Sequence, residues 1–484
     1  MFVCDNRVTY RIVTVKWNIV TMTSWLPTLS PDRPRYIAIA DAIAADLACG
    51  KLNTGERLPP QRELAWRLGV TVGTVSRAYQ EAERRGLLSG EVGRGSYLRD
   101  PTSRQSSLPS ILHAEPDMLQ MHIAEPPRVH SLADFDNVLN DIQKNAARLD
   151  LLNYWPSAGT PAYRQMGTTW LQKCDIDVSP SDVVVTAGAH AALIACLSLL
   201  VRSSDHVITE PLTYPTILPI ARLLGVTLHA AEMDENGVVA SSVEAAVRTT
   251  SARVLYVVPT LHNPTTVTLS EERRHAIAEI ARKHDLTVIE DDIFRLLAPV
   301  PQPPTIYSLA PERTYYITSL SKILAPGLRV GFVATPPGMA DGLALQQMIA
   351  GARVAGLTAE VARIWTREGT AERILNDIHN ELSMRRLMAL NTLGRRRPQC
   401  APGAMFVWLP VPDQWRPGDF ARAAQARGVR VTPGTAFSVG RRQNDHAIRV
   451  CLGPPDTREA LKDGLQKIDR LLSEEPPESF RALA

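Results

Sequence analysis

The apolar residues between positions 34 and 98 recur with the period of a helix, and they divide this part of the chain into short elements. A first helix is predicted up to Gly50, because its apolar side chains fall on one face. The stretches "PPQRELAWRLGV" and "TVGTVSRAYQEAERRGLL" predict two more helices, the first ending at Gly69 and the second beginning on the Thr71 hydroxyl. A hairpin is predicted for "LLSGEVGRGSYL", so this region is expected to fold as a small helical domain with two strands.

A different pattern begins near residue 182, where short apolar runs rich in β-branched residues alternate with helical stretches. Four such runs are "DVVVTAG", "DHVITEP", "RVLYVVPT" and "LTVIEDD". Buried parallel strands of a doubly wound sheet produce this pattern, and ligands bind at the carboxyl ends of such strands. After about residue 340 the chain becomes mostly helical and then contains "AMFVWLP", "VRVTPG" and "AIRVCLG", which predict a smaller α+β subdomain.

The composition fits two or three folded domains. A chain of 484 residues is too long for one hydrophobic core, and 45% hydrophobic with 21% charged residues is ordinary for a globular protein. The six cysteines form no C-x-x-C pair, so we expect a reduced, cytoplasmic protein without a metal site. No apolar run reaches the roughly 20 residues that a membrane span needs. The first 21 residues lack a signal-peptide cleavage pattern, and we expect translation to begin at Met22.

The third expected helix has the features of a helix that enters the DNA major groove, which needs a polar N-terminal edge and basic side chains for phosphates. Residues 31–100 hold eleven basic and nine acidic side chains, a net charge of only +2. Net charge alone therefore does not distinguish a DNA-binding domain from a small helical interaction domain whose arginines are merely solvated. The candidate DNA contacts are three small polar residues and three arginines on this helix, the preceding helix and the hairpin tip: Thr71, Thr74, Ser76, Arg62, Arg77 and Arg94.

Residues 318–331, "TSLSKILAPGLRVG", place a lysine behind a strand and a serine-rich turn. A lysine that forms a Schiff base with a cofactor must sit at the mouth of a rigid sheet, beside hydroxyls and a cation that hold an anionic ring. Lys322 fits the first requirement, and Ser319, Ser321 and Arg329 fit the second as holders of a phosphate. A lone S-x-S-K is common in surface loops, but the P-G-x-R-x-G behind it makes the pattern specific.

Further residues lie where pyridoxal phosphate would need them. The amides of Ala189 and His190 open a helix directly after a strand and would face an anion. Tyr214 could stack on a flat ring, Asn263 could hydrogen-bond a ring hydroxyl, and Asp291 could keep a pyridine nitrogen protonated. Taken singly, these three have simpler interpretations as core aromatic, turn former and helix cap. Their order along the chain favours the cofactor.

Two known families share these motifs. The stretch 58–88 resembles the winged helix-turn-helix of the GntR superfamily, although Val72 stands where Arg or Ser is usual. Most of residues 117–475 resembles fold type I, the aspartate aminotransferase family, including "YWPSAG" at 154–159. Within this resemblance Arg449 matches the arginine that grips a substrate carboxylate.

The whole chain resembles the MocR (GabR-like) regulators. This resemblance implies a winged helix fused to an α/β aminotransferase-like domain that binds pyridoxal phosphate and an amino-compound effector. It also implies double-stranded DNA near the protein's own gene as a partner, and a head-to-tail homodimer. The expected organisation is an N-terminal extension (1–30), a winged helix-turn-helix (31–99), a linker (100–116), a large cofactor domain (117–340), a small α+β subdomain (341–475) and a tail (476–484).

The chain departs from the resembled family around the aspartate. Family members place a tyrosine shortly after it, where this chain has Ile293 and Phe294, so a hydrogen bond worth about 1 kcal/mol is absent. Thr266 replaces a usual glycine, and His190 replaces a common glutamine. We therefore expect a regulator that binds the cofactor and senses a ligand. The alternatives are an active aminotransferase with an accessory DNA-binding domain, and a relic site that binds nothing.

Overall fold

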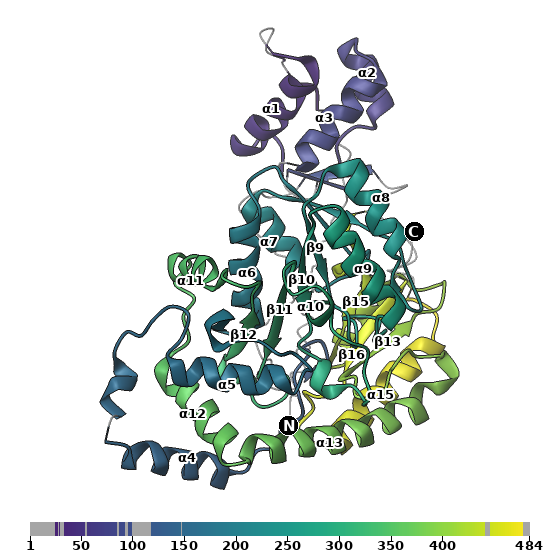
Figure 1. Ribbon diagram of the computed structural model, residues 1–484. Coiled ribbons are helices and arrows are strands. Elements are labelled where there is room, and N and C mark those ends of the chain that lie inside the picture. The colour runs from purple at the N-terminus through teal and green to yellow at the C-terminus, as the bar shows by residue number, and fades with distance from the viewer. Residues whose placement is uncertain are drawn as a thin grey trace, which may run out of the picture. The chain divides into compact units, whose positions relative to one another are not determined.

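The computed structural model describes residues 25–27, 29, 33–53, 56–84, 87–91, 95–98, 118–146, 148–440 and 446–477. The chain divides into two compact units, residues 1–107 and 108–484, and each has its own core. Their helices and strands are labelled in Figure 1. Met22, Arg94 and the expected linker at 100–116 lie outside the described residues. Within the described ranges, no helix combines the length and the apolar character that crossing a membrane requires.

The first unit contains the three helices and the hairpin that the sequence predicts. The helix α2 ends at Gly69, whose positive φ of 64° suits a glycine. The helix α3 buries one face against the core of this unit, and the two strands pair antiparallel. The elements are α1 (Arg35–Ala48), α2 (Gln61–Leu68), α3 (Val72–Arg84), β1 (Leu88–Glu91) and β2 (Gly95–Leu98). A helix-turn-helix followed by a two-stranded wing is confirmed.

A seven-stranded sheet forms the centre of the second unit. Its order is β4 (Val183–Thr186), β12 (Gly331–Ala334), β11 (Thr314–Ser319), β10 (Thr287–Asp291), β9 (Val254–Val257), β5 (His206–Thr209) and β6 (Thr227–Ala230). The sequence predicted a parallel sheet, but β12 runs antiparallel to both β11 and β4. The connection from β11 is only residues 320–330, which is shorter than the dozen or so residues that a crossover to a parallel strand needs, so the chain returns in the opposite direction.

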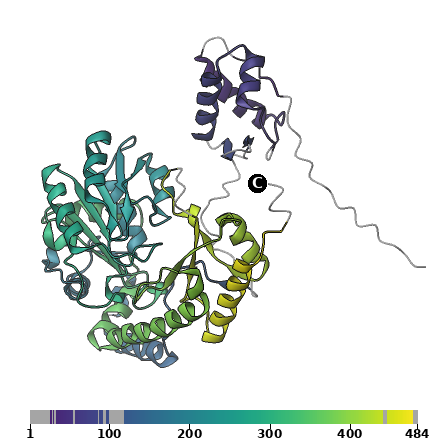
Figure 2. The same cartoon turned by 90° about the vertical axis from the view of Figure 1, so that its right-hand side faces the viewer.

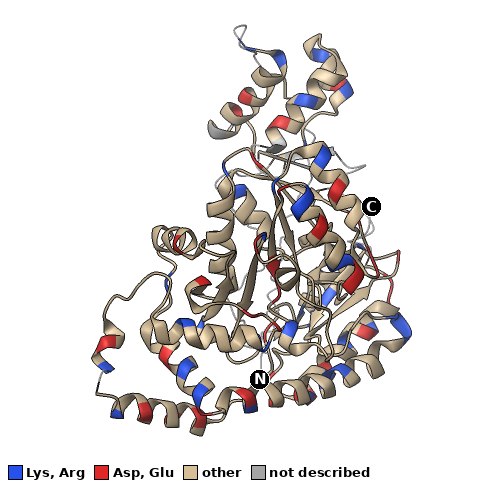
Figure 3. Cartoon of the chain, viewed as in Figure 1, with Lys and Arg blue, Asp and Glu red and all other residues tan. Residues whose placement is uncertain are grey.

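Helices cover both faces of this sheet (Figure 1). One face packs on α6 (Ala189–Leu200), α7 (Ile217–Leu224) and α11 (Ala340–Ile349). The other packs on α5 (Pro161–Gln172), α8 (Ala240–Thr250), α9 (Glu271–Lys283) and α10 (Ile306–Leu309). Among the described strands of this sheet, charged residues occur only at the end of β10, as Glu290 and Asp291, while charges are frequent on the outer helices (Figure 3). A buried carboxylate at a strand end needs a hydrogen-bonding or charged partner, so the sheet edge at Asp291 is a candidate ligand-binding site.

The C-terminal part of the second unit forms a second lobe, green to yellow in Figure 2. Its antiparallel sheet has the order β13 (Phe406–Pro410), β16 (Ala447–Cys451) and β15 (Thr432–Pro433). The short strand β14 (Val429–Arg430) pairs in parallel with β3 (Leu119–Gln120), so the start of the unit joins its end. The remaining elements are β7 (Met233–Asp234), β8 (Gly237–Val238), α4 (Leu132–Lys144), α12 (Gly356–Arg367), α13 (Thr370–Leu393), α14 (Pro417–Ala426) and α15 (Arg458–Ser473).

Candidate cofactor site and candidate DNA-contacting surface

Three neighbouring strand ends bring the expected phosphate holders together. Ser319 ends β11, Arg329 lies just before β12, and Gly188 follows β4, with these strands adjacent in the sheet. The Arg329 guanidinium donates to the carbonyl of Ala187 at 3.2 Å. A Cβ atom on Gly188 would lie 3.4 Å from the Arg329 guanidinium carbon. Arg329 therefore lies against the turn that leads into α6.

The N-terminus of α6 is open to an anion. Gly188 precedes the helix with a positive φ of 83°, and no side chain caps the first turn. The first amides of a helix have no partner within the helix, so those of Ala189 and His190 can bind an anion. Burial, with a smaller contribution from the Arg329 charge, lowers the pKa of His190 and keeps this imidazole neutral. The positive charge at this end comes from the helix and from Arg329.

The two serines have different surroundings. The Ser319 hydroxyl accepts the backbone amide of Ser321 at 3.2 Å. Its single proton can go either to the carbonyl of Val330 or to the Ser321 hydroxyl, each 3.1 Å away. Ser319 thus braces the turn, and the Ser321 hydroxyl keeps its proton for another acceptor.

Lys322 follows this turn and has the character of a nucleophilic amine. Its Nζ donates to the carbonyl of Ala124. Burial is the main cause that lowers the pKa of Lys322 to about 8, helped by Arg449 and Arg329 and opposed by Glu125. A lysine with this pKa is partly neutral near physiological pH, which the attack on a carbonyl carbon requires.

Asp291 lies at the end of β10 with one oxygen paired and one unpaired. Its Oδ2 accepts the hydroxyl of Tyr256 at 2.7 Å, while its buried Oδ1 has no hydrogen-bond partner among the described residues. Burial raises the pKa of Asp291 to about 7, and the Tyr256 hydrogen bond and the Lys322 charge act against that rise. A protonated ring nitrogen would supply the missing partner of Oδ1. Together with the open end of α6, this unpaired atom means that the residues fit pyridoxal phosphate.

Arg449 on β16 is held in place from several sides. It donates to the Asn263 side-chain oxygen at 2.7 Å and to the His122 carbonyl at 2.6 Å, and its guanidinium lies over the ring of Phe437 at 4.9 Å. Its buried Nε has no hydrogen-bond partner among the described residues. Asn263 was expected to serve a ring hydroxyl, and in this structure its oxygen orients Arg449 while its amide nitrogen stays available. A fixed guanidinium of this kind suits a carboxylate.

Two aromatic side chains complete the candidate site. Tyr214 is half-buried, and its pKa is raised mainly by burial, with Asp291, Arg329 and Arg449 near enough to act on it electrostatically. Phe294 is buried and packs edge-on against Phe406, with ring centres 5.6 Å apart. The position where a tyrosine is usual is therefore part of the hydrophobic core.

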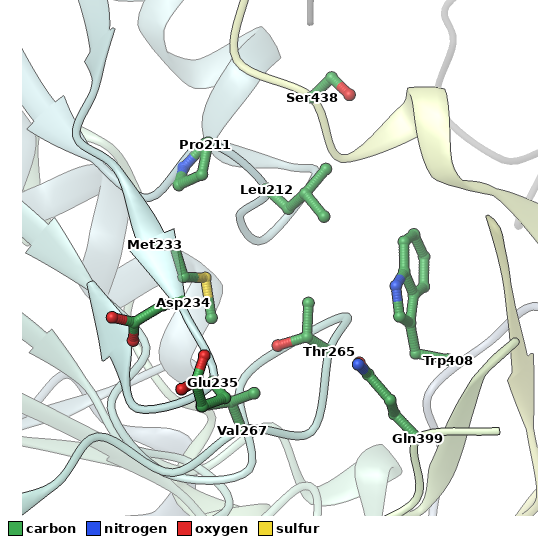
Figure 4. Close-up of a pocket in the computed structure, with 10 residues that line it drawn as sticks. All are labelled: Pro211, Leu212, Met233, Asp234, Glu235, Thr265, Val267, Gln399, Trp408 and Ser438. Carbon is green, nitrogen blue, oxygen red and sulfur yellow. The ribbon is translucent and has the colours of Figure 1, made fainter. Parts of the chain in front are cut away.

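A separate pocket of about 330 Å³ lies beside these residues, between the sheet and the C-terminal lobe (Figure 4). Leu212 and Thr265 line it from the loops that also carry Tyr214 and Asn263, and Trp408 lines it from β13. The Trp408 ring packs edge-on against Phe437, the ring beneath Arg449. None of the residues predicted for the cofactor lines this pocket.

In the first unit, the expected DNA contacts gather at the start of α3. The Thr71 hydroxyl accepts the backbone amide of Thr74 at 3.2 Å and lies 2.9 Å from the Thr74 hydroxyl, so Thr71 caps the helix. Thr71 and Arg77 are exposed, Thr74 and Ser76 are half-buried, and Arg62 is exposed at the start of α2. Neither Arg62 nor Arg77 pairs with an acidic side chain among the described residues. Five of the six candidates thus lie on α2, on α3 or at the cap of α3, and Arg94 lies outside the described residues.

Sequence reasoning missed three partners of the site residues. Tyr256 binds Asp291, the Ala124 carbonyl binds Lys322, and the His122 carbonyl binds Arg449. Backbone carbonyls carry no side-chain signal in a sequence. Tyr256 stands in the middle of an apolar strand, and its relation to Asp291 depends on the strand order.

Comparisons with known proteins agree with this division. Residues 35–98 match the family model of bacterial regulatory proteins of the gntR family. Residues 116–468 match that of aminotransferase class I and II. A curated relative from Bacillus subtilis (strain 168), the HTH-type transcriptional regulator YdeF, is 30% identical over 463 residues, which cover 93% of this chain and 97% of the relative. The HTH-type transcriptional regulator YjiR of Escherichia coli (strain K12) is 27% identical over 463 residues, which cover 88% of this chain and 97% of the relative.

Solved structures show the same fold for the larger part of the chain. An archaeal alanine:glyoxylate aminotransferase matches with a TM-score of 0.69 at 24% identity, over 74% of this chain and 91% of its own. The α-aminoadipate aminotransferase LysN from Thermus thermophilus, complexed with N-(5'-phosphopyridoxyl)-L-leucine, matches with a TM-score of 0.68 at 23% identity, over 76% and 94%. These likenesses establish a fold type I architecture.

Proposed function

Because this chain belongs to the GntR-type regulators that carry a class I and II aminotransferase domain, a MocR-like architecture, we propose that it is a DNA-binding transcription regulator. It senses pyridoxal phosphate, an amino-acid-like effector, or both. The observation that carries this proposal is the alignment with a transcriptional regulator over 97% of that relative, which spans both units. Matches to aminotransferases such as that of Thermococcus litoralis cover 69% of this chain.

The residues at the sheet edge have distinct tasks toward the cofactor. The α6 amides, Ser321 and Arg329 would hold the phosphate, with Ser319 bracing the turn. The unpaired oxygen of Asp291 would accept from the ring nitrogen, and Tyr214 would pack on the ring. When bound, pyridoxal phosphate supplies an electrophilic carbon that a primary amine can attack. Lys322 provides such an amine, since its lowered pKa of about 8 keeps part of it neutral.

Arg449 defines the class of effector. Its guanidinium is fixed by Asn263, His122 and Phe437, so it can bind a carboxylate without losing much conformational freedom. A molecule with a carboxylate for Arg449 and a primary amine that competes with Lys322 is an amino acid or a close analogue. Such a ligand acts on DNA binding only if it binds two arrangements of the protein with different affinities.

We expect the protein to act in the cytoplasm as a head-to-tail homodimer on an operator near its own gene. Large apolar side chains exposed on the second unit support self-association, because a monomer seldom leaves such a group in water. They lie on α4, on the 3-10 helix Arg148–Leu152 and on α11: Leu132, Phe135, Leu139, Leu149, Leu152, Met348 and Ile349. Sedimentation velocity of the full chain measures this directly.

The deciding experiment is the binding of DNA from the protein's own upstream region. The purified full chain is titrated against this fragment and against a shuffled fragment of equal length, with and without pyridoxal phosphate. Specific retardation that changes with the cofactor supports the proposal. Equal retardation of both fragments under all conditions contradicts it.

Residual transamination is the second candidate function, because a lysine, an aspartate and an arginine of an aminotransferase site are all present. Phe294 opposes it, since this buried ring offers no hydroxyl to the cofactor. An amino donor and a keto acid are incubated with the protein and with free cofactor. Turnover well above that of the free cofactor would favour an enzyme with an accessory DNA-binding unit.

A further inference from the structure

Three neighbouring strands align a row of side chains beneath the candidate cofactor site. In the register of the sheet, Ile289 on β10 stands beside Tyr256 on β9 and beside Tyr315 on β11. All three side chains belong to the core on the α6 face. Side chains two residues apart on a strand share a face, so Asp291 projects on this same face, one step closer to the strand ends.

The two tyrosines of this row differ in one respect. The Tyr256 hydroxyl donates to Asp291 Oδ2 at 2.7 Å, whereas the buried Tyr315 hydroxyl has no hydrogen-bond partner among the described residues. Both side chains are almost fully buried, with 0% and 1% exposed. A tyrosine that only fills the core would be expected to resemble Tyr315. Tyr256 has an additional role through its hydroxyl.

We propose that Tyr256 is a positioning residue for the cofactor: its hydroxyl fixes the Asp291 carboxylate so that Oδ1, the unpaired oxygen, faces the ring nitrogen. This inference rests on the proposed function, since it requires that pyridoxal phosphate binds at Asp291. Among the described residues, Tyr256 is the only side chain that donates a hydrogen bond to an Asp291 side-chain oxygen.

The hydrogen bond has a clear electrostatic effect. Burial favours the neutral acid, and a donor on the carboxylate favours the ionised form. For Asp291, burial is the larger of the two effects, and the Tyr256 bond is the first that opposes it. An ionised Asp291 keeps a proton on the ring nitrogen, whereas a neutral acid would leave that nitrogen unprotonated. Tyr256 therefore acts on the cofactor through Asp291 without touching it.

The test compares Tyr256→Phe with Tyr315→Phe in the full chain. Each variant removes one hydroxyl from the same row of the same core. Two quantities are measured: the dissociation constant of pyridoxal phosphate added to apoprotein, and the ¹⁵N chemical shift of the ring nitrogen in labelled cofactor. We expect Tyr256→Phe to weaken binding roughly tenfold, because a hydrogen bond to a charged group is lost, and to move the shift toward neutral pyridine. Tyr315→Phe should leave both quantities unchanged.

A double-mutant comparison separates a positioning role from a structural one. If Tyr256 acts through Asp291, adding Tyr256→Phe to Asp291→Asn should produce no further loss of affinity. An additional tenfold loss in that background would overturn the inference. Should Tyr256→Phe fail to fold, 3-fluorotyrosine at position 256 retains the ring and the hydroxyl and donates more strongly. It should then hold the ring nitrogen protonated at least as well as the natural residue, and a shift toward neutral pyridine would overturn the inference.

The outcomes also separate this inference from the proposed function. If the wild-type chain does not bind pyridoxal phosphate, the proposed function fails and this inference fails with it. If the wild type binds and Tyr256→Phe matches it in both affinity and ¹⁵N shift, only the role of Tyr256 is overturned.

Discussion

In each unit we propose that residues near the start of a helix bind phosphate, and the two helix starts are built in opposite ways. The helix α3 begins behind Thr71, whose own hydroxyl accepts the backbone amide of Thr74. The helix α6 begins behind Gly188, and no side chain caps its first turn. The helix end in the first unit is thus already satisfied, while the end in the second unit is left open.

The difference follows from the ligands. DNA offers a long row of phosphates, and a helix that reads bases must keep its end stable and bind through projecting side chains such as Arg77. A small cofactor offers one phosphate, which backbone amides and a single cation such as Arg329 can enclose. The candidate phosphate contacts therefore come from side chains in the first unit, and from backbone amides together with the Ser321 and Arg329 side chains in the second.

The covalent anchor should give the largest effect in the second unit. Lys322→Ala should abolish the absorbance band of the bound imine, whereas Lys283→Ala on the surface of α9 should keep it. In the wild type, the rate of attachment should rise with pH and level off above pH 8. Below the Lys322 pKa of about 8 the neutral amine falls about tenfold per pH unit. Stopped-flow absorbance between pH 6 and 9 measures this rate, and a pH-independent rate would contradict the assignment.

The second-largest effect should come from Arg329, the proposed cationic partner of the cofactor phosphate. Arg329→Ala should weaken the binding of pyridoxal phosphate roughly 10- to 100-fold, because a charge-assisted contact is lost. The exposed Arg202, at the far end of α6, provides a control that should bind like the wild type. Equilibrium dialysis of apoprotein gives both constants. Unchanged affinity in Arg329→Ala would mean that the phosphate lies elsewhere and that the open end of α6 serves another purpose.

The contribution of the first unit's arginines to DNA binding can be measured from the salt dependence of the DNA affinity. Arg77→Ala and Arg62→Ala should each lower DNA affinity and reduce the slope of log affinity against log salt by about 0.9, one phosphate contact. Arg67→Ala provides a matched control on α2, because this side chain is paired with Glu63. Fluorescence anisotropy at several salt concentrations measures the slopes. Equal slopes in all three variants would remove Arg62 and Arg77 from the interface.

The smallest effect concerns the cap itself. Thr71→Ala should lower the free energy of unfolding of the first unit by about 1 kcal/mol, since an N-cap is lost. The conservative variant Thr71→Ser retains an oxygen at the cap and should restore most of the stability. Chemical denaturation of the isolated first unit, residues 1–107, followed by circular dichroism, gives both values. A destabilisation by Thr71→Ser as large as that by Thr71→Ala would show that the methyl group matters rather than the cap.

Much of this architecture could be predicted because its signals are local. Helical spacing placed α3, Gly69 marked the end of α2, and the polar residues after each apolar run marked the strand ends. The antiparallel strand β12 was missed, since four apolar residues after a turn have no direction in a sequence. Asn263 was expected to serve a ring hydroxyl, and its bond to Arg449 joins residues 186 positions apart.

By itself the sequence determined which residues are available: a lysine, an aspartate and an arginine at strand ends, and a polar edge on a short helix. Only the tertiary structure decided which of them meet. The register of β9 and β10 pairs Tyr256 with Ile289, so that the Tyr256 hydroxyl reaches Asp291 two residues further along β10. The neighbouring ends of β4, β12 and β11 place Arg329 against the start of α6. The physical reason is that helical and strand periods act over a few residues, whereas strand order arises from packing between segments far apart in the chain.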